Sequence, residues 1–305
     1  MQLGYVTAIV PEWTFQQHLE FAREVGYDCL EVMCWPPGKA DRRYAGVTHL
    51  DVEKLCADAG AREEVKRQQR EYGVSISALG YYPNPLDPDE EVSRTATTHL
   101  RKLIEAADLL DVGCVTTFVG RDKTRTIADQ WPRFLEVWQP LVAYAGERGV
   151  RIAIENCPMR FTRDEWPGGT NLAVSPAVWE QMWQDLPAPH WGLNYDPSHF
   201  VLQQMDYTLP FRKYPERMHH VHAKDARIDR KALDHHGVFS HPNLWHTPKI
   251  PGQGDVDWGR FVGYLRETGY DGPVCVEVED RTYEGSLADR LRALRVSYAH
   301  LRQFT

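Results

Sequence analysis

The 305-residue chain is poor in the features that mark secreted and membrane proteins. Its six cysteines are scattered and form no CxxC pair, so neither a disulfide framework nor a cysteine-rich metal site is expected. No apolar run approaches the roughly 18–20 residues that a membrane span requires. The N-terminal stretch MQLGYVTAIVPEW lacks the pattern of a secretory signal. We therefore expect a cytoplasmic protein with free thiols and no membrane partner.

Positive charge is scarce as well. The chain has 35 Lys and Arg residues against 43 Asp and Glu residues, which gives a formal net charge of −8. Broad binding to nucleic acid needs a basic surface, so we do not expect nucleic acid as a partner. We expect a small molecule instead. The sequence leaves the oligomeric state open, and a homo-oligomer is compatible with it.

Low-complexity tracts and short-period repeats are also missing, and short β-branched runs alternate with amphipathic helical patterns instead. The expected strands are 3–9, 28–33, 74–80, 114–119, 151–155, 191–195, 218–222 and 274–278. The expected helices are 13–25, 51–72, 89–110, 130–148, 175–185, 258–268 and 287–303. Five glycines follow helical stretches at C-cap positions, namely Gly26, Gly73, Gly113, Gly149 and Gly269. Eight strands with intervening helices predict one α/β domain over 1–305, a (β/α)8 TIM barrel, with an open doubly wound sheet as the alternative.

The last four strands end in side chains of the metal-ligand type. In a barrel, alternate residues of a strand face the helices and the lumen. In RIAIEN, WGLNYD, HHVHAKD and PVCVEVED, the apolar residues occupy the alternate positions that face the helices. The inner parity therefore places four residues at the carboxyl ends of these strands, where the active sites of barrels lie. They are Glu155, Asp196, His222 and Glu277.

Taken one at a time, each of these residues is more often a cap, a turn residue or a hydrogen-bonded filler than a ligand. Three converging carboxylates without a cation, however, would repel one another and lose their hydration. A divalent metal resolves this conflict. Three carboxylates and one imidazole suit Mn2+ first, with Co2+ or Mg2+ as alternatives, better than they suit zinc with its preference for thiolates.

The motifs AIEN, NYDPSHF, HVHAKD, IPGQGDVDW and VCVEVED, in that order, resemble the sugar phosphate isomerase/epimerase superfamily with a xylose-isomerase-like TIM barrel. This superfamily includes ketose 3-epimerases, hydroxypyruvate isomerases and inosose dehydratases. The resemblance implies that the four residues bind one metal ion, that Glu155 and Glu277 also move protons, and that His199 contacts the substrate. One departure is Ile228, which stands where the epimerases have an arginine, and Arg227 is the expected substitute.

Further residues are expected around the pocket. Lys224 shares the parity of His222 and could contact the substrate, or it could pair with Asp225 or another carboxylate at the rim. Trp35 could stack on a sugar, and Tyr81 and Phe118 are expected to form walls. The two long segments near 34–50 and 225–257 are expected to be active-site loops.

The function that these expectations favour is a divalent-metal-dependent isomerase or epimerase that acts through an enediolate on a ketose, aldose or related keto-polyol. The alternative is a metal-dependent lyase or dehydratase that enolises a keto-sugar, keto-glycoside or keto-inositol in the same way. A remote alternative is a DNA-repair enzyme similar to endonuclease IV. Its metal site needs extra histidines at the ends of earlier strands, and LGYYP and TTFVG supply none.

Overall fold

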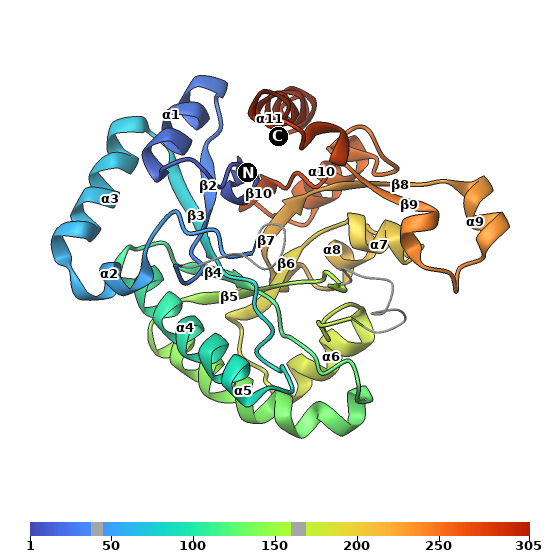
Figure 1. Ribbon diagram of the computed structural model, residues 1–305, viewed down its shortest axis with the longest axis horizontal. Coiled ribbons are helices and arrows are strands. Elements are labelled where there is room, and N and C mark those ends of the chain that lie inside the picture. Colours follow the sequence, from blue (N-terminus) through green and yellow to red (C-terminus); the bar gives the residue numbers. More distant parts are fainter. Residues whose placement is uncertain (38–44, 160–168) are drawn as a thin grey trace.

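The computed structural model describes residues 1–37, 45–159 and 169–305. Eight parallel strands close into a barrel in the order β1-β10-β7-β6-β5-β4-β3-β2, which confirms the predicted TIM barrel (Figure 1). The strands are β1 Gln2–Val6, β2 Cys29–Met33, β3 Ser75–Gly80, β4 Cys114–Thr117, β5 Arg151–Glu155, β6 Trp191–Tyr195, β7 Met218–Ala223 and β10 Pro273–Val276.

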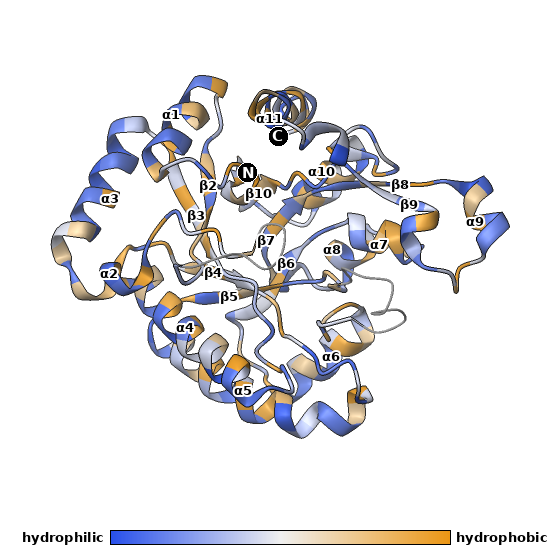
Figure 2. Ribbon diagram, viewed as in Figure 1, coloured by the Kyte–Doolittle hydropathy of each residue, from blue (hydrophilic) through white to orange (hydrophobic). Residues whose placement is uncertain are grey.

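Helices surround this barrel and pack the apolar outer faces of its strands, apart from α9 (Arg230–His236), which lies away from it (Figure 1). They are α1 Phe15–Val25, α2 Val52–Ala57, α3 Ala59–Tyr72, α4 Glu90–Leu109, α5 Ile127–Glu147, α6 Pro176–Asp185, α7 Ser198–Leu202, α8 Leu209–Lys213, α9 Arg230–His236, α10 Trp258–Glu267 and α11 Leu287–Leu301. Figure 2 shows hydrophilic and hydrophobic residues mixed along these helices, as expected when one side packs on the barrel and the other meets water. None of the helices in the described ranges is long and apolar enough to cross a membrane.

Helix boundaries follow the predicted signals with two differences. After α4 the C-cap is Leu110, and Asp111, with φ of 60°, takes the left-handed conformation ahead of the predicted Gly113. The glycines at 26 and 73 end their helices in the left-handed conformation, with φ of 102° and 67°. The expected helix 51–72, in contrast, is two helices. Asp58 adopts an extended conformation between them, and its side chain caps α3 by accepting a hydrogen bond from Gly60 N at 2.7 Å.

The expected loop 225–257 contains regular structure that the sequence did not predict. β8 (Asp225–Ile228) and β9 (His246–Lys249) form an antiparallel hairpin, and α9 lies at its far end, away from the barrel (Figure 1). The other long loop, 34–50, lies partly outside the described residues. Its two stems meet in an antiparallel bridge between Cys34 and Thr48.

Candidate functional site

The four predicted ligands meet at one end of the barrel. Glu155 ends β5, Asp196 directly follows β6, His222 lies near the end of β7, and Glu277 directly follows β10. These strands are consecutive in the barrel, so their carboxyl ends form one continuous arc. One ligand atom from each residue lies within 4.8 Å of the others, and the group could hold a metal ion.

The His222 ring links this group to a second polar layer. Its Nδ1 atom faces the carboxylates of Glu155 and Glu277, at 3.6 and 3.5 Å. This atom is buried and has no hydrogen-bond partner among the described residues. On the other edge of the ring, Nε2 lies 2.6 Å from Oε2 of Glu31, which is fully buried. The free nitrogen therefore points at the carboxylates of the candidate site.

Asp196 is held in place by its neighbours. Its backbone N–H donates to the side chain of Asn156 at 2.8 Å, and its Oδ1 accepts from Ser198 N, also at 2.8 Å. Its Oδ2 is buried and lacks a hydrogen bond of good geometry within the described ranges, although it lies 2.9 Å from Lys224 Nζ and 3.2 Å from His199 Nε2. Oδ1 of Asp196 thus accepts from the backbone of Ser198, while Oδ2 faces the other charged groups of the site.

Lys224 extends into the same group of oxygens. Its Nζ lies 2.6 Å from Glu277 Oε2, 2.9 Å from Asp196 Oδ2, 3.2 Å from Glu279 Oε2 and 3.8 Å from Glu155 Oε1. Its side chain is only 3% exposed. Of the two interpretations of Lys224, the structure shows the pairing with carboxylates, although the partners are the ligand residues and Glu279 rather than Asp225.

The charged groups of the site shift one another's pKa. Burial by itself would lower the pKa of His222, but the carboxylates of Glu31 and Glu277 raise it well above its usual value. Burial would raise the pKa of Asp196, but Lys224 lowers it strongly. Burial likewise opposes the charge of Lys224, while Asp196 and Glu277 raise its pKa well above the ordinary range. Aspartate and lysine are therefore both ionised at neutral pH.

The donor set fits a divalent cation. With neutral histidines, Glu155, Asp196 and Glu277 supply three negative charges, Lys224 supplies one positive charge, and two negative charges remain. Protons on His222 and His199, whose pKa values the neighbouring carboxylates raise, could offset these two charges. A divalent ion would neutralise both and would also give the buried His222 Nδ1 the partner that it lacks among the described residues.

His199, the predicted substrate contact, lies next to this group. Its Nε2 is 3.2 Å from Glu155 Oε1 and 3.2 Å from Asp196 Oδ2. Burial lowers the pKa of His199, but Cys157 and Asp196 raise it well above its usual value. His199 therefore contacts two of the candidate ligands.

The other predicted residues contact aromatic neighbours or are exposed. Trp35 is half-buried and packs edge-on against Tyr81 at 4.8 Å between centroids, and Tyr81 packs in turn on His99. Phe118 packs against Tyr82 at 4.8 Å. Arg227 is exposed on β8 of the hairpin. Their contacts with a substrate remain predictions.

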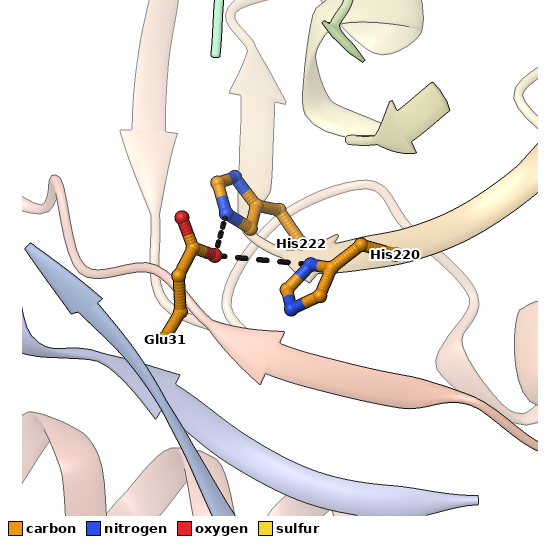
Figure 3. Close-up of side chains that lie close together, drawn as sticks. All are labelled: Glu31, His220 and His222. Atoms are coloured by element: carbon orange, nitrogen blue, oxygen red, sulfur yellow. Dashed lines mark hydrogen bonds and ion pairs between the residues drawn. The ribbon is translucent and has the colours of Figure 1, made fainter. Parts of the chain in front are cut away.

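A second polar layer consists of Glu31, Tyr82, Thr116, Asn194 and His220. The alternation of the strands predicts that Asn194 and His220 face the lumen, but the prediction missed Glu31, Tyr82 and Thr116. Glu31 Oε1 accepts from Thr116 Oγ1 at 2.7 Å and from the Tyr82 hydroxyl. Figure 3 shows dashed lines from one carboxylate oxygen of Glu31 to the rings of both His220 and His222. The alternation rule would have found Glu31, because Leu30 and Val32 on either side of it belong to the outer apolar core.

Comparison with known proteins agrees with this architecture. A family model described as xylose isomerase-like TIM barrel matches residues 19–304. The uncharacterized protein YfiH of Bacillus subtilis (strain 168) is 27% identical over 97% of this chain and 98% of its own length. An inosose dehydratase of Lacticaseibacillus casei is 26% identical over 55% of this chain and 53% of that protein. The alignment thus spans about half of the dehydratase.

Solved structures show the same fold. The structure of D-psicose 3-epimerase with D-tagatose from Clostridium cellulolyticum H10 superposes with a TM-score of 0.69 at 16% identity, over 100% of this chain and 99% of that one. The structure of the IolI protein with a bound zinc atom superposes with a TM-score of 0.70 at 17% identity, again over 100% and 99%.

Proposed function

Because the chain belongs to the xylose isomerase-like TIM barrel family, we propose that it is a metal-dependent isomerase or epimerase that enolises a ketose, aldose or related keto-polyol. The observation that supports this most is the convergence of Glu155, Asp196, His222 and Glu277, with His222 Nδ1 buried and unpaired in the described part of the chain. A bound divalent ion would polarise the substrate carbonyl and lower the pKa of the adjacent C–H.

We propose Mn2+ as the ion, with Co2+ or Mg2+ as alternatives, because three of the four ligands are carboxylates. The zinc atom in the IolI structure supports a divalent ion in a barrel of this fold. A small sugar or keto-sugar is the proposed partner. The cytoplasmic location is also a proposal, supported by six cysteines that are all free.

The protein's own side chains would move the protons. Glu277 is the more accessible carboxylate, with a side chain 20% exposed, while Glu155 is 3% exposed. Glu155 is also held by His199 through Oε1. In our proposal one glutamate takes the proton from the substrate carbon and the other returns one, on the opposite face or on the neighbouring carbon. Lys224 and His199 then contact the substrate oxygens.

The resemblance to inosose dehydratases favours a second candidate, a lyase or dehydratase on a keto-sugar, keto-glycoside or keto-inositol. The enolisation would be the same, but a β-substituent would leave instead of a proton returning. Lys224, a buried ammonium beside the ligands, could protonate that leaving group. We do not extend the proposal to DNA repair, because the ends of β3 and β4 present Tyr81 and Phe118 rather than histidines.

The test uses the purified protein, loaded with Mn2+, and a panel of neutral keto-sugars and inososes in D2O. Proton NMR reports exchange of the C–H next to the carbonyl, a new stereoisomer from an epimerase, and an enone or released group from a lyase. Exhaustive chelation should abolish all of these, and added Mn2+ should restore them. Full activity after chelation would refute the proposed metal dependence.

A further inference from the structure

Glu31 is a buried carboxylate that contacts a candidate metal ligand from the opposite side of the barrel. It belongs to β2, whereas His222 belongs to β7, and β1 and β10 lie between these strands. Glu31 and His222 are both fully buried, and Oε2 lies 2.6 Å from His222 Nε2 (Figure 3). Ionising a carboxylate in such a place costs free energy unless donors surround it.

The donors around Glu31 meet this need. Thr116 Oγ1 donates to Oε1 at 2.7 Å, and the Tyr82 hydroxyl donates to the same oxygen. The other oxygen of Glu31, Oε2, lies 2.6 Å from His222 Nε2 and 3.7 Å from His220 Nδ1. Glu31 is therefore an acceptor on both oxygens.

This arrangement determines which nitrogen of His222 carries the proton. Nε2 is 2.6 Å from the Glu31 carboxylate and 2.9 Å from Asn194 Nδ2, and it cannot donate to the first and accept from the second at once. The carboxylate is the nearer and the charged partner, so Nε2–H donates to it. The Asn194 amide has another acceptor in the Tyr82 hydroxyl, at 3.1 Å. The lone pair of neutral His222 then lies on Nδ1, which faces Glu155 and Glu277.

His220 completes the layer. Its Nδ1 donates to Asn194 Oδ1 at 2.9 Å, and its Nε2 lies 3.1 Å from Ser77 Oγ. Both ring nitrogens are therefore used within the protein. The same contacts fix the orientation of Asn194, which faces His222 on one side and His220 on the other.

We propose that Glu31 is a positioning residue that holds His222 with its proton on Nε2 and its lone pair on Nδ1, ready to bind a divalent cation. The inference rests on the proposed function, because it assumes that His222 is a metal ligand. A carboxylate behind a ligating histidine fixes the tautomer and makes the ligand more basic. Loss of such a partner typically weakens metal binding about 10- to 100-fold.

The test measures the affinity of the metal-free full-length protein for Mn2+ and Zn2+ by chelator competition. Glu31→Gln keeps the shape and an acceptor oxygen but removes the charge, and Glu31→Asp keeps the charge but shortens the side chain. Both should bind each ion about 10- to 100-fold more weakly. Ser77→Ala is the matched control, since it removes a contact to His220 and none to His222. Its affinity should stay within about twofold of wild type.

A second readout follows the tautomer itself. Two-bond 15N–1H spectra of the Zn2+-loaded protein with labelled histidines should show the His222 proton on Nε2 in wild type and in Ser77→Ala. In Glu31→Gln, that proton should lose the downfield shift of a hydrogen bond to a carboxylate. Circular dichroism and thermal unfolding confirm that each variant is folded.

The outcomes separate the two proposals. If wild type binds no divalent ion, the proposed function is overturned. If wild type binds the ion and the folded Glu31 variants bind it equally well, or His222 carries its proton on Nδ1, the role of Glu31 is overturned while the proposed function stands. Weaker binding in both Glu31 variants, with Ser77→Ala unchanged, supports the role of Glu31.

Discussion

Two variants, Glu277→Gln and Glu155→Gln, would separate proton transfer from metal binding. Each substitution leaves a carbonyl oxygen for the cation but removes the group that accepts a proton at neutral pH. It also lowers the negative charge of the ligand carboxylates from three to two, so cation binding should weaken without being lost. General acid–base catalysis is worth about 100- to 10,000-fold. At saturating Mn2+ we therefore expect turnover to fall at least about 100-fold in each variant.

The two variants should differ in proton exchange. The Glu277 side chain is 20% exposed, whereas that of Glu155 is 3% exposed and held by His199. The more accessible Glu277 is the expected first base. Glu277→Gln should therefore exchange no substrate C–H with D2O, while Glu155→Gln should exchange it without forming product. Proton NMR with the substrate that wild type converts makes this measurement. Turnover near the wild-type rate in both variants, with metal bound, would refute the assignment and turn attention to Lys224 or His220.

Three further predictions concern metal binding and stability. His222→Ala should lose both metal and activity, whereas His199→Ala should keep the metal and raise KM; metal analysis decides, and an empty site in His199→Ala would make His199 a ligand. Lys224→Met should bind Mn2+ more tightly in a titration of the metal-free protein, because the ammonium no longer competes for the same oxygens; weaker binding would contradict this. Burial lowers the pKa of His18 to about 2 and that of His49 to about 4, so the unfolded chain takes up more protons than the folded one below about pH 6.5. His49 alone should contribute a fall of about 2 kcal/mol in the free energy of unfolding between pH 7.5 and 5. Urea unfolding of wild type and His49→Gln at the two pH values measures this contribution as a difference, and the same pH dependence in both proteins would refute it.

The segment 225–257 is tied to the barrel at its base. The Asp225 carboxylate, which directly follows the Lys224 position, accepts from Gly252 N at 3.0 Å, from Val256 N at 3.0 Å and from Trp258 Nε1 at 2.9 Å. Lys249 Nζ lies 3.1 Å from Asp280, close after Glu277 on the chain. Because these contacts are buried, the base of the hairpin should act as a fixed wall of the site, and a lid motion would be confined to its far end.

The sequence could predict the four candidate ligands because each depends on local alternation alone. In β5 to β7 and β10, apolar residues mark the outer face so regularly that the parity of Glu155, Asp196, His222 and Glu277 follows without any knowledge of neighbouring strands. The same alternation around Glu31 contains the signal for the second layer. The rule identifies the face of a residue, however, and gives no partner.

Partners across the lumen depend on barrel closure and on register, which single strands do not encode. Glu31 and His222 are 191 positions apart in the sequence and on strands that are not adjacent. The pairing of β2 with β3 shifts register between Leu30 and Glu31, an irregularity that leaves no mark in the alternation. At the end of β3, Gly80 lies close to Glu31 and Thr116. Directly after it, Tyr81 packs on Trp35 and His99, whereas Tyr82 contacts Glu31. Tyr81 and Tyr82 are adjacent in the sequence and point in different directions, and Tyr82 is the one that donates to Glu31 behind His222. This difference becomes visible only in the closed barrel.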